Sequence, residues 1–177
     1  MGRFSLHAVA PDRPGIVAAV TQSLADIGCN LEDSRMTLLR GQFSIVLVFD
    51  APGLSSGAMI EEALASILEQ FALQLLVHPI SDDVDTEEFG NLVSISAHGA
   101  DHPGTVSRVA HAVAVAGGNI VDLVGHVVPE DAMTPSHLEI TIAIDQTAVA
   151  DLEVALRALA IELGMRCEVR NEATRSI

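Results

Sequence analysis

The sequence predicts an α+β fold that is built twice, and three observations support this prediction. The segment Asp12–Gly15 (DRPG) returns 89 residues later as Asp101–Gly104 (DHPG), with the surrounding apolar positions in register. Each copy shows the order strand, helix, strand, strand, helix, strand. An acidic stretch over residues 81–90 separates the copies. Agreement at a fixed offset over so many turn and core positions indicates an internal repeat.

The composition narrows the class of protein. Of the 177 residues, 49% are hydrophobic, and Trp and Tyr are absent, so we expect aliphatic cores. The formal net charge of −15 and the lack of a basic patch disfavour direct nucleic-acid binding. Cys29 and Cys167 occupy non-equivalent positions, so neither a disulfide framework nor a cysteine metal site is expected. With no leader and no apolar run of about 18 residues, we expect a cytoplasmic protein without a membrane segment.

The first copy opens with alternating apolar and polar residues over positions 4–9, the pattern of a half-buried strand. A residue before proline is pushed out of the helical region, so we expect the first helix to have Arg13 near its N-cap and Pro14 as its first residue. Apolar residues at helical spacing then form one stripe as far as Gly28, which ends the helix.

The remainder of the first copy reads as a hairpin, a helix and a strand. Residues 30–39 are extended, and the broken alternation at 32–35 predicts a bulge or an edge strand. A short turn leads to a β-rich run over 43–49. Apolar residues on one face over 59–71 predict a single second helix, and residues 73–78 form the last strand.

The second copy repeats this order with a longer hairpin loop, residues 129–135. Its predicted strands are 92–98, 119–128, 138–144 and 165–170, and its predicted helices are 103–116 and one that starts after Thr147 and ends at Gly164. The predicted boundaries are a first domain over 1–80, a linker over 81–90, a second domain over 91–171 and a tail over 172–177. Two βαββαβ units of this size predict ferredoxin-like domains, each an antiparallel four-stranded sheet with two helices on one face.

Two segments that recur in both copies resemble the ACT domain. The first copy has DRPGIV after its first strand and GCNLED at the start of its second strand, and the second copy has DHPGTV and GGNIVD at the same places. The resemblance implies a regulatory module that senses an amino acid, with no catalytic residues and no cofactor. Within ACT proteins, the chain is most similar to the glycine cleavage system transcriptional repressor family, which is also a stand-alone tandem pair.

The helix-start loop offers free backbone N–H groups beside a glycine, which suits a carboxylate. In ACT domains the effector typically binds between this loop and the second-strand start of a neighbouring domain. The resemblance therefore implies one site at Asp12, Arg13, Pro14, Gly15, Asn30, Leu31 and Asp33, and another at Asp101, His102, Pro103, Gly104, Asn119, Ile120 and Asp122. The expected ligand is a small amino acid such as glycine or serine.

The same residues also have explanations that involve no ligand. Proline at a helix start is common without any ligand. Asn30 and Asn119 are also typical of turns, where asparagine tolerates a left-handed backbone. His102 replaces Arg13 in the second copy, which leaves open whether both copies bind the same ligand.

Three segments come close to the sequence pattern of an enzyme or a metal site. Residues 53–57 match G-x-S-x-G, so a small serine hydrolase using Ser55 is an alternative function, although the second copy has no equivalent and the predicted sheet is antiparallel. Residues 99–104 have P-loop spacing without its lysine. His98 and His102 are four apart but lie on a turn, so no metal site is expected.

We therefore expect a non-catalytic sensor that changes its pairing on binding an amino acid and so modulates a protein partner, either a transcription factor or a metabolic enzyme. A ligand-free dimerisation module is the other alternative. Val46, Val48 and Leu76 make the helix-free face of the first sheet apolar. Exposed apolar patches are usually interfaces, so we expect another subunit of a homodimer or the second copy to cover this face.

Overall fold

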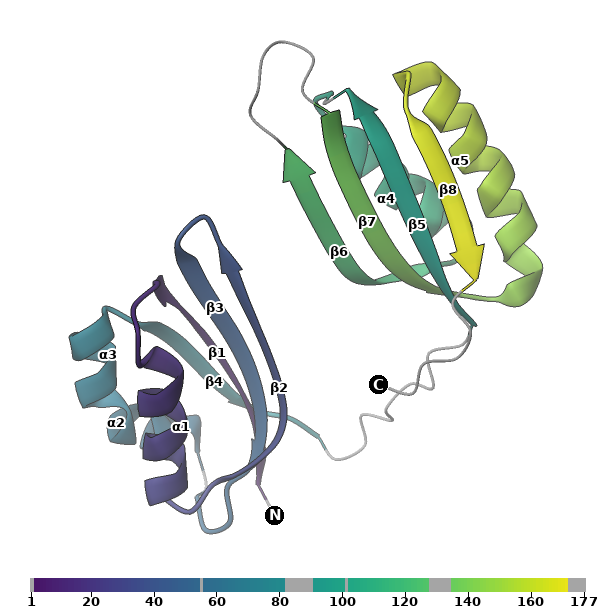
Figure 1. Cartoon of the computed structure of the whole chain (residues 1–177). Coiled ribbons are helices and arrows are strands. Elements are labelled where there is room, and N and C mark those ends of the chain that lie inside the picture. Colours follow the sequence, from purple (N-terminus) through teal and green to yellow (C-terminus); the bar gives the residue numbers. More distant parts are fainter. Residues whose placement is uncertain (1, 55, 82–90, 101, 128–134, 172–177) are drawn as a thin grey trace. The chain divides into compact units, whose positions relative to one another are not determined.

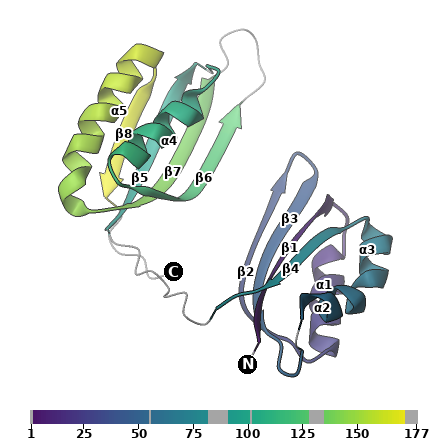
Figure 2. The same ribbon diagram turned by 180° about the vertical axis from the view of Figure 1, so that it is seen from behind.

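The computed structural model describes residues 2–54, 56–81, 91–100, 102–127 and 135–171, and it divides the chain into two compact units, residues 1–85 and 86–177. We call them unit 1 and unit 2. Each unit is a four-stranded sheet with helices on one face (Figure 1), and the view from behind shows α4 and α5 in front of the sheet of unit 2, with α5 running alongside β8 (Figure 2). The predicted α+β class with two ferredoxin-like domains is confirmed.

Unit 1 places its two central strands between two edge strands. Its elements are β1 (Arg3–Pro11), α1 (Ile16–Asp26), β2 (Asn30–Leu39), β3 (Gln42–Asp50), α2 (Gly57–Ala63), α3 (Ala65–Phe71) and β4 (Gln74–Pro79). All neighbouring strands are antiparallel, in the order β2-β3-β1-β4. The core between sheet and helices includes Phe4, Phe43 and Phe49 as well as aliphatic side chains, so it is less purely aliphatic than predicted.

Unit 2 repeats this architecture. Its elements are β5 (Asn91–Ala100), α4 (Thr105–Val115), β6 (Asn119–Val127), β7 (Pro135–Ile144), the 3-10 turn η1 (Gln146–Ala148), α5 (Val149–Leu163) and β8 (Arg166–Asn171). The antiparallel strand order is β6-β7-β5-β8. Its core is aliphatic, with Val93, Ile95, Ile140, Ile142 and Leu152 almost fully buried.

The irregular stretch predicted in the second strand is a β-bulge on an edge strand. The register of β2 against β3 shifts between Leu31 and Asp33, and that of β6 against β7 shifts between Ile120 and Asp122. Both strands lie at the edge of their sheet. The same irregularity therefore recurs at the same place in both copies, as a built-in feature of the repeat.

Two helix predictions need correction. The single helix predicted over 59–71 is divided at Leu64, whose φ of −91° and ψ of −2° interrupt the helical run between α2 and α3. Thr147 is not the N-cap of the last helix: the Asp145 carboxylate accepts hydrogen bonds from the Thr147 backbone N–H at 2.8 Å and from its hydroxyl at 2.6 Å. Asp145 caps η1, which leads into α5, because its carboxylate satisfies a donor at the helix start.

Candidate functional site

The helix-start loop of unit 1 forms a tight turn. The Ile16 backbone N–H donates to the carbonyl of Arg13 at 3.4 Å, and Gly15 has φ 93° and ψ −7°. These are the dihedral angles of the third residue of a type II turn, which favours proline followed by glycine. The predicted helix start with Arg13 at the N-cap and Pro14 first is therefore wrong. Helix α1 begins at Ile16 with Gly15 as N-cap, because the turn uses Pro14 and Gly15.

The loop of unit 2 forms the same turn. The Thr105 N–H donates to the carbonyl of His102 at 3.2 Å, and Gly104 has φ 87° and ψ 3°. The Thr105 hydroxyl donates to the same carbonyl at 2.9 Å, so this turn has an additional hydrogen bond. Helix α4 begins at Thr105, and the predicted start at Pro103 is wrong for the same reason. Asp101 lies outside the described residues.

The turn leaves donors without acceptors at the start of α1. The first backbone hydrogen bond back to the cap runs from the Ala19 N–H to the Gly15 carbonyl at 2.9 Å. In the described part of the chain, the N–H groups of Val17 and Ala18 have no backbone acceptor. Such N–H groups carry the positive end of the helix dipole, so a carboxylate is stabilised there.

A hollow of about 430 Å³ opens beside this helix start. Its lining comes from the loop, α1 and two strands: Asp12, Arg13, Gly15, Ile16, Val17, Ala18, Met36 and Phe43. The Arg13 guanidinium donates to the carbonyl of Gln70 at 3.4 Å, which holds a positive charge at the rim. The sequence analysis missed Met36 and Phe43, because only the packing of α1 on the sheet brings these strand residues beside the loop.

The other predicted half of the site lies at the opposite end of the same sheet. Asn30, at the start of β2, pairs with Asp50, whereas Pro11, at the end of β1, pairs with Gln42. Eight steps along β3 separate Gln42 from Asp50, which corresponds to about 27 Å at the usual rise per residue. The loop and the strand start of one unit therefore do not contact the same small amino acid.

Unit 2 has the same separation. β6 begins with Asn119 opposite Ala143, and β5 ends with Ala100 opposite Pro135, at the other end of β7. Ile120 packs partly against the core, and the half-buried Asp122 follows the bulge. In neither unit do the two predicted halves of the site lie together.

The strand-start asparagines are not left-handed turn residues. Gly28 and Gly117 take the positive φ values, 81° and 77°, whereas Asn30 and Asn119 belong to the strands that follow. The alternative interpretation from the sequence is therefore wrong on this point. The Asn30 side chain is exposed and makes no hydrogen bond with any described residue, so its amide is available.

The two strand starts differ in charge. In unit 1 the Arg3 Nε lies 2.8 Å from a Glu32 carboxylate oxygen, and a second Arg3 nitrogen donates to the other oxygen at 3.2 Å. In unit 2 the equivalent positions are Leu92 and Val121. The ion pair balances the charge of Glu32, which lies in the bulge of unit 1 close to Asn30 in the sequence.

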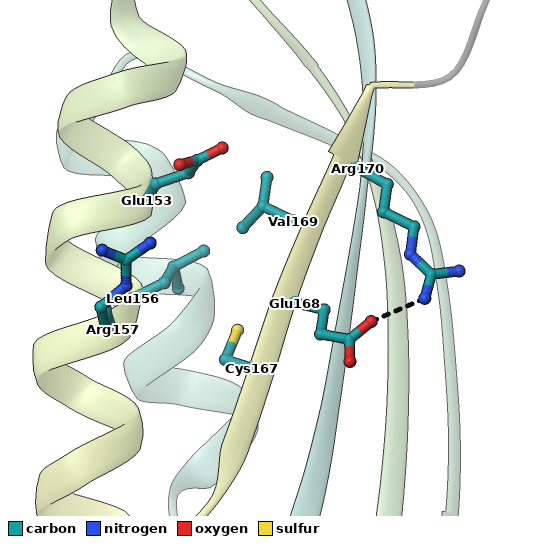
Figure 3. A pocket seen from close by; sticks show the side chains of 7 residues that line it. All are labelled: Glu153, Leu156, Arg157, Cys167, Glu168, Val169 and Arg170. Carbon is teal, nitrogen blue, oxygen red and sulfur yellow. Dashed lines mark hydrogen bonds and ion pairs between the residues drawn. The ribbon is translucent and has the colours of Figure 1, made fainter.

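A second hollow, of about 300 Å³, lies between α5 and β8 (Figure 3). Cys167 points from β8 toward α5, which contributes Glu153 and Arg157, while Glu168 and Arg170 pair at 2.6 Å on the other side of the strand. Burial, and secondarily the charge of Glu168, raises the pKa of the Cys167 thiol. Raising the pKa of this thiol reduces the share of the thiolate, which is the nucleophilic form.

The enzyme signatures gain no support from the described residues. Ser55 lies outside them, as do the predicted tail and all but Ser81 and Pro135 of the predicted linker and hairpin loop. Gly99, which shares the P-loop spacing, belongs to β5 and packs against Met165. None of the described helices combines the length and apolarity that a membrane crossing requires.

The fold defines the class: a tandem pair of ferredoxin-like domains. A family model described as the ACT domain matches residues 6–78 and 91–170. The chain belongs to the ACT domain family. ACT domains are regulatory modules that sense amino acids, so the chain has a regulatory, amino-acid-sensing role and is not an enzyme.

Its relatives support the same class. The chain is 28% identical to the glycine cleavage system transcriptional repressor of Escherichia coli (strain K12) over 161 residues, which cover 89% of this chain and 84% of that protein. It is 34% identical to a UPF0237 protein of Methanopyrus kandleri over 79 residues, 44% of this chain and 87% of that protein. An unknown protein from Galdieria sulphuraria superposes with a TM-score of 0.84 at 25% identity, covering 97% of this chain and 99% of that chain. The resemblance inferred from the sequence motifs is confirmed.

Proposed function

We propose that the protein senses a small amino acid such as glycine or serine, with the carboxylate bound at the start of α1. The observation that carries the proposal is the pair of N–H groups, those of Val17 and Ala18, beside a hollow of about 430 Å³. The Arg13 guanidinium at the rim adds a second positive group on a chain whose net charge is −15. The free N–H groups and the guanidinium together favour an anion at this point.

The ammonium group needs an acceptor, which the Asn30 amide oxygen or the Asp33 carboxylate of a neighbouring unit provides. Both are exposed at a strand start, and both are too far from the loop of their own unit to reach the same ligand. The complete site therefore combines the helix-start loop of unit 1 in one chain with the strand start of unit 1 in a second chain. A homodimer supplies the missing half.

The regulatory output acts through protein contacts. The relative from Escherichia coli is a transcriptional repressor, and a chain with 24 acidic and 9 basic residues is poorly suited to hold DNA itself. The protein partner is a transcription factor or a metabolic enzyme in the cytoplasm, contacted differently in the free and ligand-bound states.

Unit 2 is the weaker binding unit in this proposal. It has the same turn and the same exposed helix start, but His102 stands where unit 1 has Arg13. An arginine side chain is always charged and has five donors, whereas neutral histidine has one. The carboxylate therefore loses a permanent positive partner at this loop.

A first test introduces a carboxylate into the anion site. Val17 is 39% exposed and lines the hollow, so the side chain of Val17→Asp competes with the ligand carboxylate and repels it. An acid in the first helical turn is favourable for the helix, so folding is preserved. Calorimetry with glycine, serine and the other amino acids should show affinity reduced roughly tenfold or more, the loss of a charge-assisted contact.

The matched control is Val106→Asp, which makes the same change at the equivalent helix start of unit 2, where Val106 is 45% exposed. We expect the main binding event to survive in this variant. Equal affinity in wild type and Val17→Asp would overturn the site. If no amino acid binds the wild type, the chain is instead a ligand-free dimerisation module. Gly15→Val is a poorer probe of this site, because a φ of 93° strains any β-branched residue although the space around it is open.

A second test removes the proposed ammonium acceptor. Asn30→Ala deletes an exposed amide that has no partner in the described part of the chain, so its effect on folding is small. A hydrogen bond to a charged group contributes about 1.5–3 kcal/mol, so affinity should fall roughly ten- to a hundredfold. Asn119→Ala is the equivalent change in unit 2. Unchanged calorimetric affinity in both variants would exclude the strand starts from the site.

A further inference from the structure

Three histidines form a row on the helix-free face of the unit 2 sheet. In the strand register, His126 on β6 lies opposite His137 on β7, and His137 lies opposite His98 on β5. In unit 1 the corresponding row is Thr37, Ser44 and Val9. The histidine row is therefore a feature of unit 2 and is not required by the fold.

Two of these rings already converge through their nitrogens. The Nδ1 atoms of His98 and His137 are 2.8 Å apart, and the ring centroids are 4.1 Å apart. The outer nitrogens are also engaged: Nε2 of His137 lies 3.0 Å from a Glu139 carboxylate oxygen, and Nε2 of His98 lies 2.9 Å from the Ser96 hydroxyl. Both imidazoles thus direct Nδ1 toward the same point and have an oxygen partner on Nε2.

This arrangement is the one that metal-binding histidines adopt. A ligating histidine offers one nitrogen to the metal and donates the other N–H to a carboxylate or another oxygen, which fixes its orientation and tautomer. We propose that unit 2 binds a Zn²⁺ ion through Nδ1 of His98 and Nδ1 of His137, with His126 as the third protein ligand. The ion takes the place of the proton that the two Nδ1 atoms now share.

The ligand set suits zinc. Imidazole nitrogens are good ligands for Zn²⁺, which prefers four tetrahedral ligands, so three histidines leave one position for water. The described residues contain no preformed group of three metal ligands. His126 is exposed at the edge of the sheet, so its ring is free to turn toward the other two when the ion binds.

The charges around the row permit a cation. Glu139 lies beside His137, while Glu168, in the next row, is paired with Arg170 at 2.6 Å. Arg166 on β8 lies opposite His98 on β5 in the strand register, and its positive charge disfavours a cation in that row. Its side chain is exposed, and a long arginine side chain keeps its guanidinium in water.

The test is a Zn²⁺ titration of the full chain, in which binding is measured by calorimetry or by competition with a chromophoric chelator. We expect His98→Ala and His137→Ala each to weaken the binding about tenfold or more, and Glu139→Gln, which only orients His137, to weaken it within the range of about ten- to a hundredfold seen for such partners. His126→Ala should weaken binding as well. Acidification should release the ion, because ligating imidazoles must be deprotonated.

Unit 1 supplies the matched control. His7 and His78 also stack on a helix-free sheet face, with centroids 5.3 Å apart, but the short nitrogen contact of His7 is to Ser5. His78→Ala should therefore leave Zn²⁺ binding unchanged. The proposal is overturned if the wild type binds no more tightly than the His98→Ala/His137→Ala double variant, and the assignment of His126 is overturned if its removal has no effect.

Discussion

A single methyl group distinguishes the C-terminal caps of two equivalent helices. Ala72, after α3, has φ 53° and ψ 41°, and Gly164, after α5, has φ 62° and ψ 29°. A left-handed backbone costs an L-residue roughly 1–2 kcal/mol, whereas glycine adopts it without that steric cost. Ala72→Gly should therefore increase the free energy of unfolding by about 1 kcal/mol in urea denaturation.

The reciprocal variant, Gly164→Ala, is the control and should lower stability by a similar amount. No atom lies within 4 Å of the position of the added Cβ, so the effect comes from backbone conformation and not from a clash. Equal stability of both variants and wild type would show that these two caps relax without cost.

At the scale of elements, close packing of α2 on β4 depends on the absence of a side chain. A Cβ on Gly57 would lie 2.8 Å from the carbonyl oxygen of Val77 and 3.3 Å from its carbonyl carbon. Because backbone atoms cannot rotate away, Gly57→Ala should push the first turn of α2 off the strand and cost about 1–3 kcal/mol. Denaturant unfolding measures this, and Glu61→Ala on the exposed face of α2 should stay within about 0.5 kcal/mol.

Periodicity predicted the elements well because their patterns are local. The apolar stripe of α1 is buried at Ile16, Val20 and Leu24, and the bulge in β2 appears where alternation breaks. The interruption at Leu64 has no such signal, because the apolar face continues through it and Leu64 itself is fully buried. The predicted helix starts were wrong because proline followed by glycine encodes a type II turn as readily as a helix start.

The candidate sites show a different limit of sequence reasoning. The motif residues of unit 1 were found directly, but Met36 joins the hollow only through packing of the sheet against α1. Likewise, the spacing of His98 and His102 suggested no metal site, and no local pattern pairs His98 with His137. That contact depends on the register of β5 against β7, which is a property of the folded sheet.

At the scale of the whole molecule, the helix-free face of unit 1 remains a predicted interface. Leu76 is 58% exposed and Val9 is 45% exposed on this face, and Val46 and Val48 are half-buried beside them. The same face of unit 2 carries Ser96, Glu139 and Glu168 among other polar residues. Apolar surface of this kind is usually covered by a partner.

We therefore expect a homodimer that Leu76→Asp weakens, because a carboxylate buried in an apolar interface loses its hydration. Light scattering over a range of protein concentrations measures the mass. Val154→Asp introduces the same charge on α5, where Val154 is 66% exposed, and should leave the mass unchanged. A wild type that is monomeric at all concentrations, or a dimer indifferent to Leu76→Asp, would contradict this interface.

The separation of about 27 Å between the loop and the strand start of one unit has a thermodynamic consequence if the amino acid bridges two chains. Ligand binding and self-association are then reciprocal: each is strengthened by the other through the same coupling free energy. The midpoint of an amino-acid titration should shift to lower ligand concentration as the protein concentration rises, by mass action. Such a protein responds to the product of two abundances, its effector's and its own, so a cell can set the threshold of the response through the amount of protein it makes.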